Sequence, residues 1–113
     1  MNETDRIRVQ HMLDAGREAM SFISGRNRED LGSDRMLALS LIAEIQIIGE
    51  AAARVSAESR QAAPSVPWGE LIGMRNRLVH WYADINFDIL WNTVTLAVPA
   101  LILQLESLLL PDS

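Results

Sequence analysis

The segment from Met74 to Tyr82 gathers side chains that can act on a phosphodiester. It contains Arg75, Asn76 and His80, and it holds one of the two histidines and the only tyrosine of the chain. An imidazole can take a proton from a 2′-hydroxyl near neutral pH. A guanidinium can hold the phosphate and offset the charge that builds in the transition state. Asn76 can donate to a phosphate or a base edge, and Tyr82 can stack on a base.

The chain shows no metal-binding pattern beside this segment. Asp, Glu and His do not cluster at ligand spacing, and the absence of cysteine excludes thiolate sites. We therefore predict chemistry that uses neither a metal ion nor a cofactor. Such chemistry needs RNA, because only RNA carries its own attacking 2′-hydroxyl. Arg75 and Arg77 carry the only formal charges in residues 71–83, and Arg77 is a candidate RNA contact.

Helical geometry sets a condition on this site. Residues five apart on an α-helix differ in direction by about 140°, so Arg75 and His80 do not share a face of a regular helix. Either the helix ends or tightens near His80, or the two side chains converge on a groove from opposite sides. A two-fold dimer is a further solution, because two copies of the segment would line one cleft and double its positive charge.

A structural role is the alternative for each of these residues. A histidine near a helix C-terminus can cap the helix or pair with its dipole. Arg75 can form a surface ion pair, and Trp81 can pack in the core. His11, the other histidine, is interpreted as a surface or inter-helix residue.

Length and charge narrow the class of protein. A chain of 113 residues is expected to form one domain, residues 1–113. All ten basic residues other than histidine are arginine, and the net charge is -5, which argues against broad non-specific nucleic-acid binding. The absence of cysteine fits a reducing compartment, and Met1 to Val9 lacks the apolar core of a secretory signal. We expect a cytoplasmic protein.

Apolar spacing of three and four predicts an all-α fold. No strand pattern is found, and we expect an up-and-down bundle of four to five helices with short connections. A polar loop is expected at residues 26–33. The predicted helices cover residues 4–24, 33 or 34 to about 61, 67–80 and 87–110.

Capping and breaking residues set the expected helix ends. Thr4 or Asp5 is expected to cap the first helix, Ser33 or Asp34 the second, and Asn86 the last. Gly25 stands where a helix-ending residue is expected. The buried face of the third helix is expected to hold Leu71, Met74 and Leu78, with Trp68 packed at its start. Glu50 and Arg54 are interpreted as an exposed pair one turn apart.

The last helix is the most apolar part of the chain. Only Glu106 is charged between Asp88 and Asp112, and the helix is long enough to cross a bilayer. Its proline and polar residues and the lack of basic flanks argue against a membrane span. Pro99 is expected to kink it. Because a helix that is apolar nearly all round needs covering on several sides, we expect part of it to meet a second chain.

The sequence resembles a known family. Arg75-Asn76-x-x-x-His80 resembles the Arg-polar-x(3–5)-His motif of HEPN-domain ribonucleases, and its extension through Trp81 to Tyr82 resembles the Arg-x(4)-His-x-Tyr form of HepT-like toxins. The resemblance runs from about Asp34 to Leu105. Other segments that carry it, in the same order as in the family, are Ile48-Gly49-Glu50-Ala51, Val66-Pro67-Trp68, Gly73-Met74-Arg75-Asn76 and Asp88-Ile89-Leu90-Trp91.

The resemblance implies a function and partners. It implies an all-α homodimer that acts as a metal-independent endoribonuclease, with both motifs in a cleft at the dimer interface. It implies Arg75 and His80 as catalytic residues, with Asn76 in support. It also implies a toxin–antitoxin pair, in which an MntA-like nucleotidyltransferase antitoxin transfers AMP to Tyr82 and silences the nuclease.

Two other functions stay open on the sequence. The chain can be a non-catalytic helical dimer that binds nucleotide or a nucleotidyltransferase partner, with the motif as a phosphate contact. It can also be a purely structural dimer module. Glu50 can orient Arg75 from the neighbouring helix, although a structural role for Glu50 is preferred because helix-flank pairs are common.

Overall fold

The chain forms a bundle of helices, as the sequence predicts. The computed structural model describes residues 1–81 and 84–111, except for the side chains of residue 75 and residues 78–81. Every regular element in that part is helical, so the predicted all-α class is confirmed. The elements are α1 (Glu3–Ile23), α2 (Asp30–Ser33), α3 (Arg35–Arg54), α4 (Ala57–Ala62), α5 (Trp68–Trp81), α6 (Phe87–Asn92), the π-helical segment η1 (Thr93–Ala97) and α7 (Val98–Leu109).

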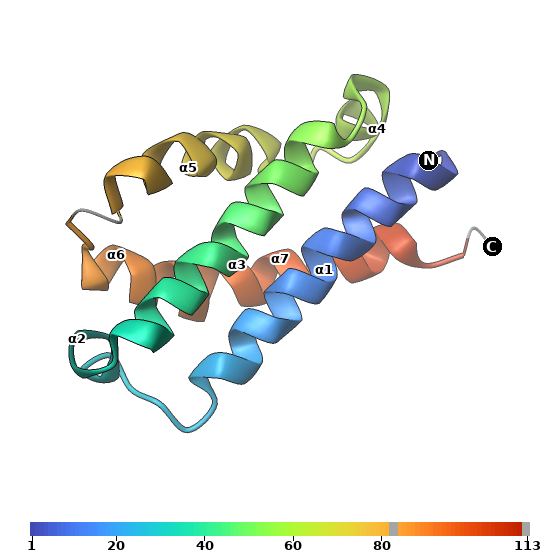
Figure 1. Cartoon of the computed structure of the whole chain (residues 1–113). Helices are drawn as coiled ribbons and strands as arrows, with labels where there is room; N and C mark the ends of the chain where they lie inside the picture. Colours follow the sequence, from blue (N-terminus) through green and yellow to red (C-terminus); the bar gives the residue numbers. More distant parts are fainter. Residues whose placement is uncertain (82–83, 112–113) are drawn as a thin grey trace.

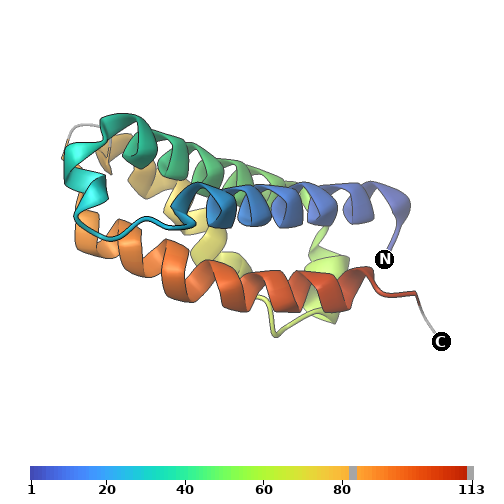
Figure 2. The ribbon, with the colours of Figure 1, turned by 90° about the horizontal axis from the view of Figure 1, so that it is seen from below.

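The helices lie in two layers. α1 and α3 lie side by side in Figure 1, and α5 packs along the other side of α3. The continuous helix α6–η1–α7 runs behind them, as the view in Figure 2 shows. Its buried side completes two apolar clusters, one at each end of the bundle. The side chains that are 0% exposed are Val9, Met12, Ala19, Ala38, Leu41, Ile42, Ala52, Leu90, Val94 and Leu105.

The packing between α1 and α7 depends on a small residue. Gly16 is buried on α1, and a Cβ built there would lie 3.3 Å from Cγ1 of Ile102 on α7. That distance is shorter than an ordinary van der Waals contact, so the Ile102 side chain would have to shift by a few tenths of an ångström to admit a larger residue. Gly16 therefore lies on the face of α1 that packs against α7.

The start of α1 differs from the prediction. Asn2 caps the helix, with its Oδ1 accepting from the Asp5 backbone N–H at 2.7 Å, so the expectation of Thr4 or Asp5 as the cap was wrong. Asp5 is instead 3% exposed. Its carboxylate accepts from the backbone N–H of Ser56 at 3.0 Å and from the hydroxyls of Ser56 and Ser59, each at 2.6 Å.

These hydrogen bonds accompany a break in the predicted second helix. We expected one helix from Ser33 or Asp34 to about Gln61, but α3 ends at Arg54 and the short helix α4 begins at Ala57. Ser56 caps α4 by accepting from the Ser59 backbone N–H. Asp5 holds the same serine from a distant part of the chain, so a tertiary contact replaces the helical continuation that local propensity favours.

Replacing Asp5 by alanine is therefore expected to destabilise the fold. The change leaves three donors of Ser56 and Ser59 without their acceptor in a partly buried site. We expect the thermal midpoint to fall by several degrees, measured by circular dichroism at pH 7. Asp14→Ala, an exposed carboxylate on the same helix, is the control and should change the midpoint little. An unchanged midpoint in Asp5→Ala would show that this carboxylate is dispensable.

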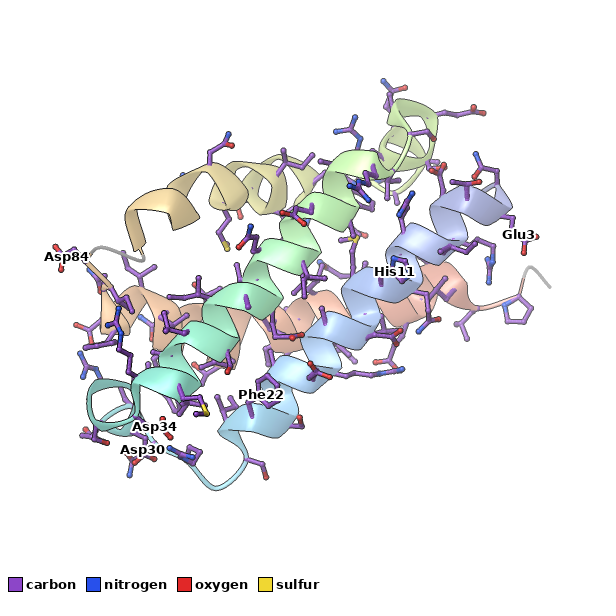
Figure 3. The ribbon with its side chains drawn as sticks, viewed as in Figure 1. Glu3, His11, Phe22, Asp30, Asp34 and Asp84 are labelled. Atoms are coloured by element: carbon purple, nitrogen blue, oxygen red, sulfur yellow. The ribbon has the colours of Figure 1, made fainter. Side chains whose placement is uncertain are left out.

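The polar segment before α3 is more ordered than predicted. Gly25 ends the first helix with a positive φ of 74°, as expected for a glycine in this position. The expected loop at residues 26–33 contains the short helix α2, and Arg26 bridges to Asp30 at 3.4 Å and Asp34 at 2.7 Å. Both carboxylates carry labels in Figure 3. Asp34 also caps α3, which confirms one of the two predicted caps.

The long C-terminal helix contains an irregular turn. Asn86 caps it as predicted, accepting from the Ile89 backbone N–H. The π-helical segment η1 ends at Ala97, two residues before Pro99, which lacks an N–H to donate to the carbonyl four residues back. The hydroxyls of Thr93 and Thr95 each donate to a carbonyl one turn earlier at 2.7 Å, a bond that commonly bends helices. The structure thus shows a π-helical turn just before Pro99, and the kink expected at Pro99 stays a prediction.

Two helices in the described ranges are long and apolar enough to cross a membrane. They are α3 and the continuous helix from Phe87 to Leu109. Length and composition alone do not separate a membrane span from the core helix of a bundle. α3 is 56% buried over its most apolar stretch, as a core helix is, whereas the C-terminal helix is only 28% buried. The second helix therefore leaves an apolar side uncovered.

Candidate functional site

The candidate motif lies on α5, whose start is firmly held. Trp68 is 8% exposed, and its indole Nε1 donates to the Ala63 carbonyl at 3.0 Å. The backbone N–H of Leu71 donates to the carbonyl of Pro67 at 3.0 Å, which places Pro67 just before the helix. The predicted packing of Trp68 is confirmed. Leu71 is buried and Met74 is half-buried, as predicted, while the Leu78 side chain lies outside the description.

The second half of α5 carries the motif. Asn76 and Arg77 are exposed, so both are accessible to an external ligand. Arg75 and His80 belong to the same helix, but their side chains lie outside the description, and so does all of Tyr82. Position 80 follows Asn76 by one turn and Arg77 by three residues, which places these three positions on one side of the helix. The structure thus leaves the convergence of Arg75 and His80 as a prediction.

The end of the bundle that bears the motif is braced by an ion pair. Arg28, between α1 and α2, contacts Asp88 on α6 at 2.6 Å. α5 ends at Trp81 and α6 begins at Phe87, so this exposed contact links the start of α6 to the segment before α2. Glu50 on α3 accepts from Gln46 at 3.2 Å, a contact within its own helix that fits the preferred structural role.

An apolar groove runs beside the motif helix. Its floor and walls come from α3, α5, η1 and α7, and its volume is about 50 Å³. Glu70 is its one charged residue among the described side chains. A groove of this size is too small for a nucleotide. The lining residues are Ile45, Ile48, Pro67, Glu70, Leu71, Met74, Thr93, Ala97, Val98 and Leu101.

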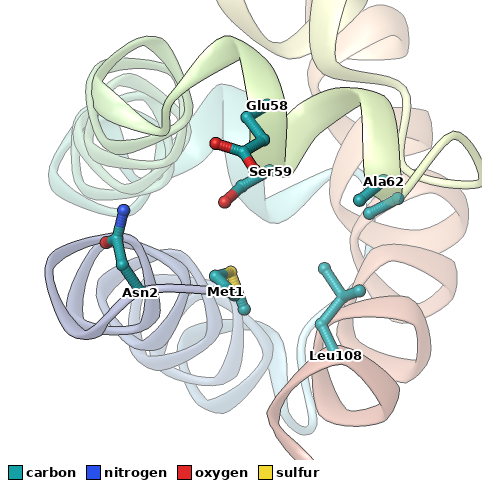
Figure 4. A pocket seen from close by; sticks show the side chains of 7 residues that line it. Met1, Asn2, Glu58, Ser59, Ala62 and Leu108 are labelled. Carbon is teal, nitrogen blue, oxygen red and sulfur yellow. The ribbon is translucent and has the colours of Figure 1, made fainter.

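A larger hollow lies at the other end of the bundle, away from the motif. It measures about 400 Å³ and is formed by α4 and the two ends of the chain. Figure 4 shows Met1 and Asn2 on one side, Glu58, Ser59 and Ala62 on another, and Leu108 closing the ring. None of the motif residues lines it. Because no motif residue reaches this hollow, we assign the functional site to α5 instead.

A third hollow, between α1 and α3, contains a carboxyl pair that the sequence analysis missed. Glu44 is 6% exposed. Its burial, together with a hydrogen bond to Glu18 and the charge of Glu18, raises its pKa to about 7. Asp14 and His11 line the same hollow, and His11 is exposed, as predicted (Figure 3). The spacing of Glu44 from Leu41 and Ile48 already places it on the buried stripe of the helix.

This pair makes stability depend on pH. The pKa of Glu44 is raised in the folded chain, so the folded state binds a proton that the unfolded state has released above its ordinary pKa of about 4.5. Stability from this proton is fully present below about pH 4.5 and is lost as the pH rises through 7. We expect the thermal midpoint to fall between pH 6 and pH 8, and to fall less in Glu44→Gln, which keeps the shape without the charge. Equal slopes in both proteins would contradict this.

The described part of the chain contains no cluster of metal ligands. No three side chains among histidine, aspartate and glutamate come together there in a way that could hold an ion. The metal independence of the reaction stays a prediction.

Comparison with known proteins identifies the motif region as part of a larger similarity. The family model for "Ribonuclease HepT-like" matches residues 12–108. A "Putative RNase" of Caldanaerobacter subterraneus subsp. tengcongensis is 32% identical over 95% of this chain and 96% of its own length. A "Putative RNase" of Methanocaldococcus jannaschii is 30% identical over 84% of this chain and 87% of its own length. A "Probable ribonuclease HepT" of Thermococcus cleftensis is 32% identical over 71% and 73%. No solved structure matches.

Proposed function

This chain belongs to the HepT-like ribonuclease family, and we propose on that premise that it is a metal-independent endoribonuclease toxin of the cytoplasm. The observation that carries the proposal is the placement of the motif on one helix, with Asn76 and Arg77 open to solvent. RNA is a suitable substrate because the guanidinium groups of the motif can bind its phosphates, although the chain as a whole is acidic. Arg77 is assigned a contact with the RNA backbone.

The proposed reaction uses the substrate's own nucleophile. His80 takes the proton of a 2′-hydroxyl, and the oxygen attacks the adjacent phosphorus. The bond from phosphorus to the 5′-oxygen then breaks, and the leaving oxygen takes a proton from a general acid. The products are a 2′,3′-cyclic phosphate and a 5′-hydroxyl. Arg75 offsets the charge that builds on the phosphoryl oxygens, and Asn76 positions the phosphate or His80.

We place the reaction in a cleft shared by two copies of the chain. Arg75 and His80 differ by about 140° around one regular helix, so a single α5 does not bring both to the same side. Two motif segments facing each other across a two-fold axis would supply guanidinium and imidazole groups from both sides. The doubled positive charge would also offset the net charge of -5 that opposes RNA binding.

Regulation by a partner completes the proposal. An MntA-like nucleotidyltransferase antitoxin would transfer AMP from ATP to Tyr82, forming a bond between the phenol oxygen and phosphorus and releasing pyrophosphate. A bulky anionic group beside Arg75 and His80 would fill the cleft and repel the RNA backbone. Such a partner would act on the free toxin, and its gene is expected to lie next to the toxin gene.

The modified residue can be identified by one substitution. In cells that also produce the antitoxin, the purified wild-type chain should carry one AMP group and cut no RNA. Tyr82→Phe, which lacks the phenol oxygen, should carry none and should keep its activity. His80→Ala is the control, because it retains the acceptor and should still be modified. Intact-mass measurement checks all three. AMP on Tyr82→Phe, or full cleavage by the modified wild type, would remove Tyr82 from this role.

The proposed activity is separated from simple binding by one assay. Purified protein is incubated with labelled RNA in the presence of EDTA, and both retention and cleavage are followed. We expect shortened RNA. Binding without cleavage would favour the alternative, a non-catalytic helical dimer that binds nucleotide or a nucleotidyltransferase. If the protein neither binds nor cleaves the RNA, the remaining alternative is a purely structural module.

A further inference from the structure

Three arginines at one corner of the bundle have no carboxylate partner among the described residues. They are Arg8 on α1, Arg54 at the end of α3 and Arg60 on α4. Figure 1 shows the start of α1, the end of α3 and all of α4 at the same end of the bundle. The ion pairs of the described part are made by other arginines. The corner therefore holds positive charge that no direct contact neutralises.

A network around Asp5 places Arg8 and Arg60 on facing sides of two helices. Asp5 accepts from the hydroxyls of Ser56 and Ser59, each at 2.6 Å, so α1 and α4 meet at these residues. Arg8 follows Asp5 by three residues, about one helical turn. Arg60 follows Ser56 by four residues, again about one turn. Both arginines therefore project from the sides of α1 and α4 that meet.

The carboxylates of this corner are occupied or face away. Asp5 accepts three hydrogen bonds from the two serines of α4. Glu50, one turn before Arg54, accepts a hydrogen bond within its own helix, and no contact of ion-pair length joins the two, so the pair expected from the sequence does not form. Glu58 differs in direction from Arg60 by about 200° around the helix and lines the hollow on the other side of α4 (Figure 4).

Two of these arginines are held in place at a cost to the fold. The Nε atoms of Arg8 and Arg60 are covered by protein and have no hydrogen-bond partner in the part of the chain that the structure describes. Burying a donor without an acceptor destabilises a fold, and an apolar side chain suits such a position better. Both residues keep part of their surface exposed, so the packed stems present the guanidinium ends to solvent. Guanidinium groups fixed in this way bind phosphate oxygens with little further ordering.

The open shape of the corner favours an extended ligand. Pockets for small molecules enclose most of their ligand, whereas Arg8, Arg54 and Arg60 do not line the hollow of about 400 Å³ beside α4. Separate guanidinium groups on a surface suit a backbone that carries a phosphate at every nucleotide. α5 begins close to this corner, because the indole of Trp68 donates to the carbonyl of Ala63 directly after α4. One RNA strand of several nucleotides can therefore reach both the corner and the motif helix.

We propose that Arg8, Arg54 and Arg60 form a second phosphate site, which binds the backbone of single-stranded RNA several nucleotides away from the bond that is cut. The choice of RNA rests on the proposed function, which brings this polyanion to α5. The site itself rests on the missing carboxylate partners, the covered Nε atoms and the meeting of α1 with α4. A free nucleotide carries the same phosphate chemistry, and the experiment separates the two sources.

Arg8→Met/Arg60→Met tests the site. Methionine keeps an unbranched apolar stem and removes both the charge and the unpartnered Nε. Binding of a 2′-O-methyl RNA of about 20 nucleotides, longer than a typical single-strand site, is measured over a range of salt concentrations. Each phosphate contact contributes about 0.7 to the slope of log K against log salt. We expect the slope to fall by about 1.4 and the affinity near 0.1 M salt to fall by about tenfold or more.

Two further readouts separate binding from a structural role. The thermal midpoint of Arg8→Met/Arg60→Met should not fall, because an apolar stem replaces a donor that has no acceptor. An RNA of about four nucleotides, which covers only the motif, should bind the wild type and the double variant equally well. Arg54→Gln changes an exposed side chain and should lower the salt slope by about 0.7 with an unchanged midpoint. This single variant carries the test if the double variant does not fold.

Arg6→Met/Arg17→Met is the matched control. It removes the same formal charge from the same helix, but both arginines have partners within the chain. Arg6 donates to the Leu109 carbonyl at 3.0 Å, and Arg17 contacts Glu106 at 3.5 Å. Its salt slope should stay close to that of the wild type. An equal loss in the control, or an unchanged slope and affinity in Arg8→Met/Arg60→Met and Arg54→Gln, would overturn the site.

The remaining outcomes distinguish the source of the phosphate and the fate of the proposed function. If AMP raises the thermal midpoint of the wild type but not of Arg8→Met/Arg60→Met, while both bind RNA equally, the site takes a free nucleotide and the assignment to RNA is wrong. If RNA binds with the expected losses but unmodified RNA is never cut, the proposed function is rejected and the site stands. If the wild type cuts RNA and the variants bind it unchanged, the site is rejected and the function stands.

Discussion

His80→Ala is expected to lose RNA cleavage by about 10²–10⁴-fold, the range that a positioned general acid or base contributes. His80 lies in the second half of α5, one turn after the exposed Asn76. In the proposed reaction it removes the proton of the attacking 2′-hydroxyl. An alanine leaves RNA binding largely intact, because the guanidinium groups that hold the phosphates remain. The rate constant for cleavage should fall while the affinity for RNA changes little.

The other histidine provides the matched control. His11 is exposed on α1 and lines the hollow that holds Glu44, away from the motif helix. His11→Ala should cleave RNA at the wild-type rate. The wild-type rate should also vary with pH around neutrality, where imidazole titrates. If His80→Ala keeps the wild-type rate and His11→Ala loses it, the assignment of the general base to His80 is wrong.

Arg75→Ala is expected to reduce cleavage by about 10²–10³-fold, the effect of removing one group that stabilises charge in the transition state. Its effect should differ from that of His80→Ala, because the guanidinium also contacts the ground-state phosphate. We therefore expect weaker RNA binding as well as a lower rate. Arg75→Lys should recover only part of the activity, since an ammonium lacks the planar fork that binds two phosphate oxygens.

Arg35→Ala is the control for charge. Arg35 is exposed at the start of α3, so its removal lowers the net charge equally without touching the motif. If the loss in Arg75→Ala is only an effect of net charge, the two variants should behave alike, and the loss in both should disappear at high salt, where long-range charge is screened. A selective loss in Arg75→Ala, across salt concentrations, supports direct contact with the phosphate.

The sequence predicted the parts of the fold that depend on local signals. Asp34 and Asn86 cap the helices expected of them, and Gly25 has the positive φ that ends α1. The sequence-based prediction was wrong where a residue distant in the chain determines the local structure. The break between α3 and α4 is held by Asp5, which is 51 residues from Ser56 in the chain, and no local pattern shows such a bond. α2 was missed because one turn of helix in a polar segment has no apolar period.

The site was predictable in its residue types and only partly in its geometry. The motif falls on a helix, as expected, and Asn76 and Arg77 are exposed. The meeting of Arg75 and His80 stays a prediction, because their side chains lie outside the described part of the structure. Glu44 was overlooked because its charge suggested an exposed position, although its spacing marks the buried stripe. The uncovered side of the long helix was expected from its composition, and the helix is only 28% buried over its most apolar stretch.

The central claim is that this chain cuts RNA through the substrate's own 2′-hydroxyl, without a metal ion. The most direct measurement compares an RNA oligonucleotide with the same sequence carrying 2′-O-methyl groups throughout, both incubated with the wild-type protein in EDTA. The account predicts that the RNA is cut, leaving a 2′,3′-cyclic phosphate, and that the methylated oligonucleotide stays whole. Cleavage of the methylated oligonucleotide, or cleavage of RNA only after Mg²⁺ is added, would contradict it.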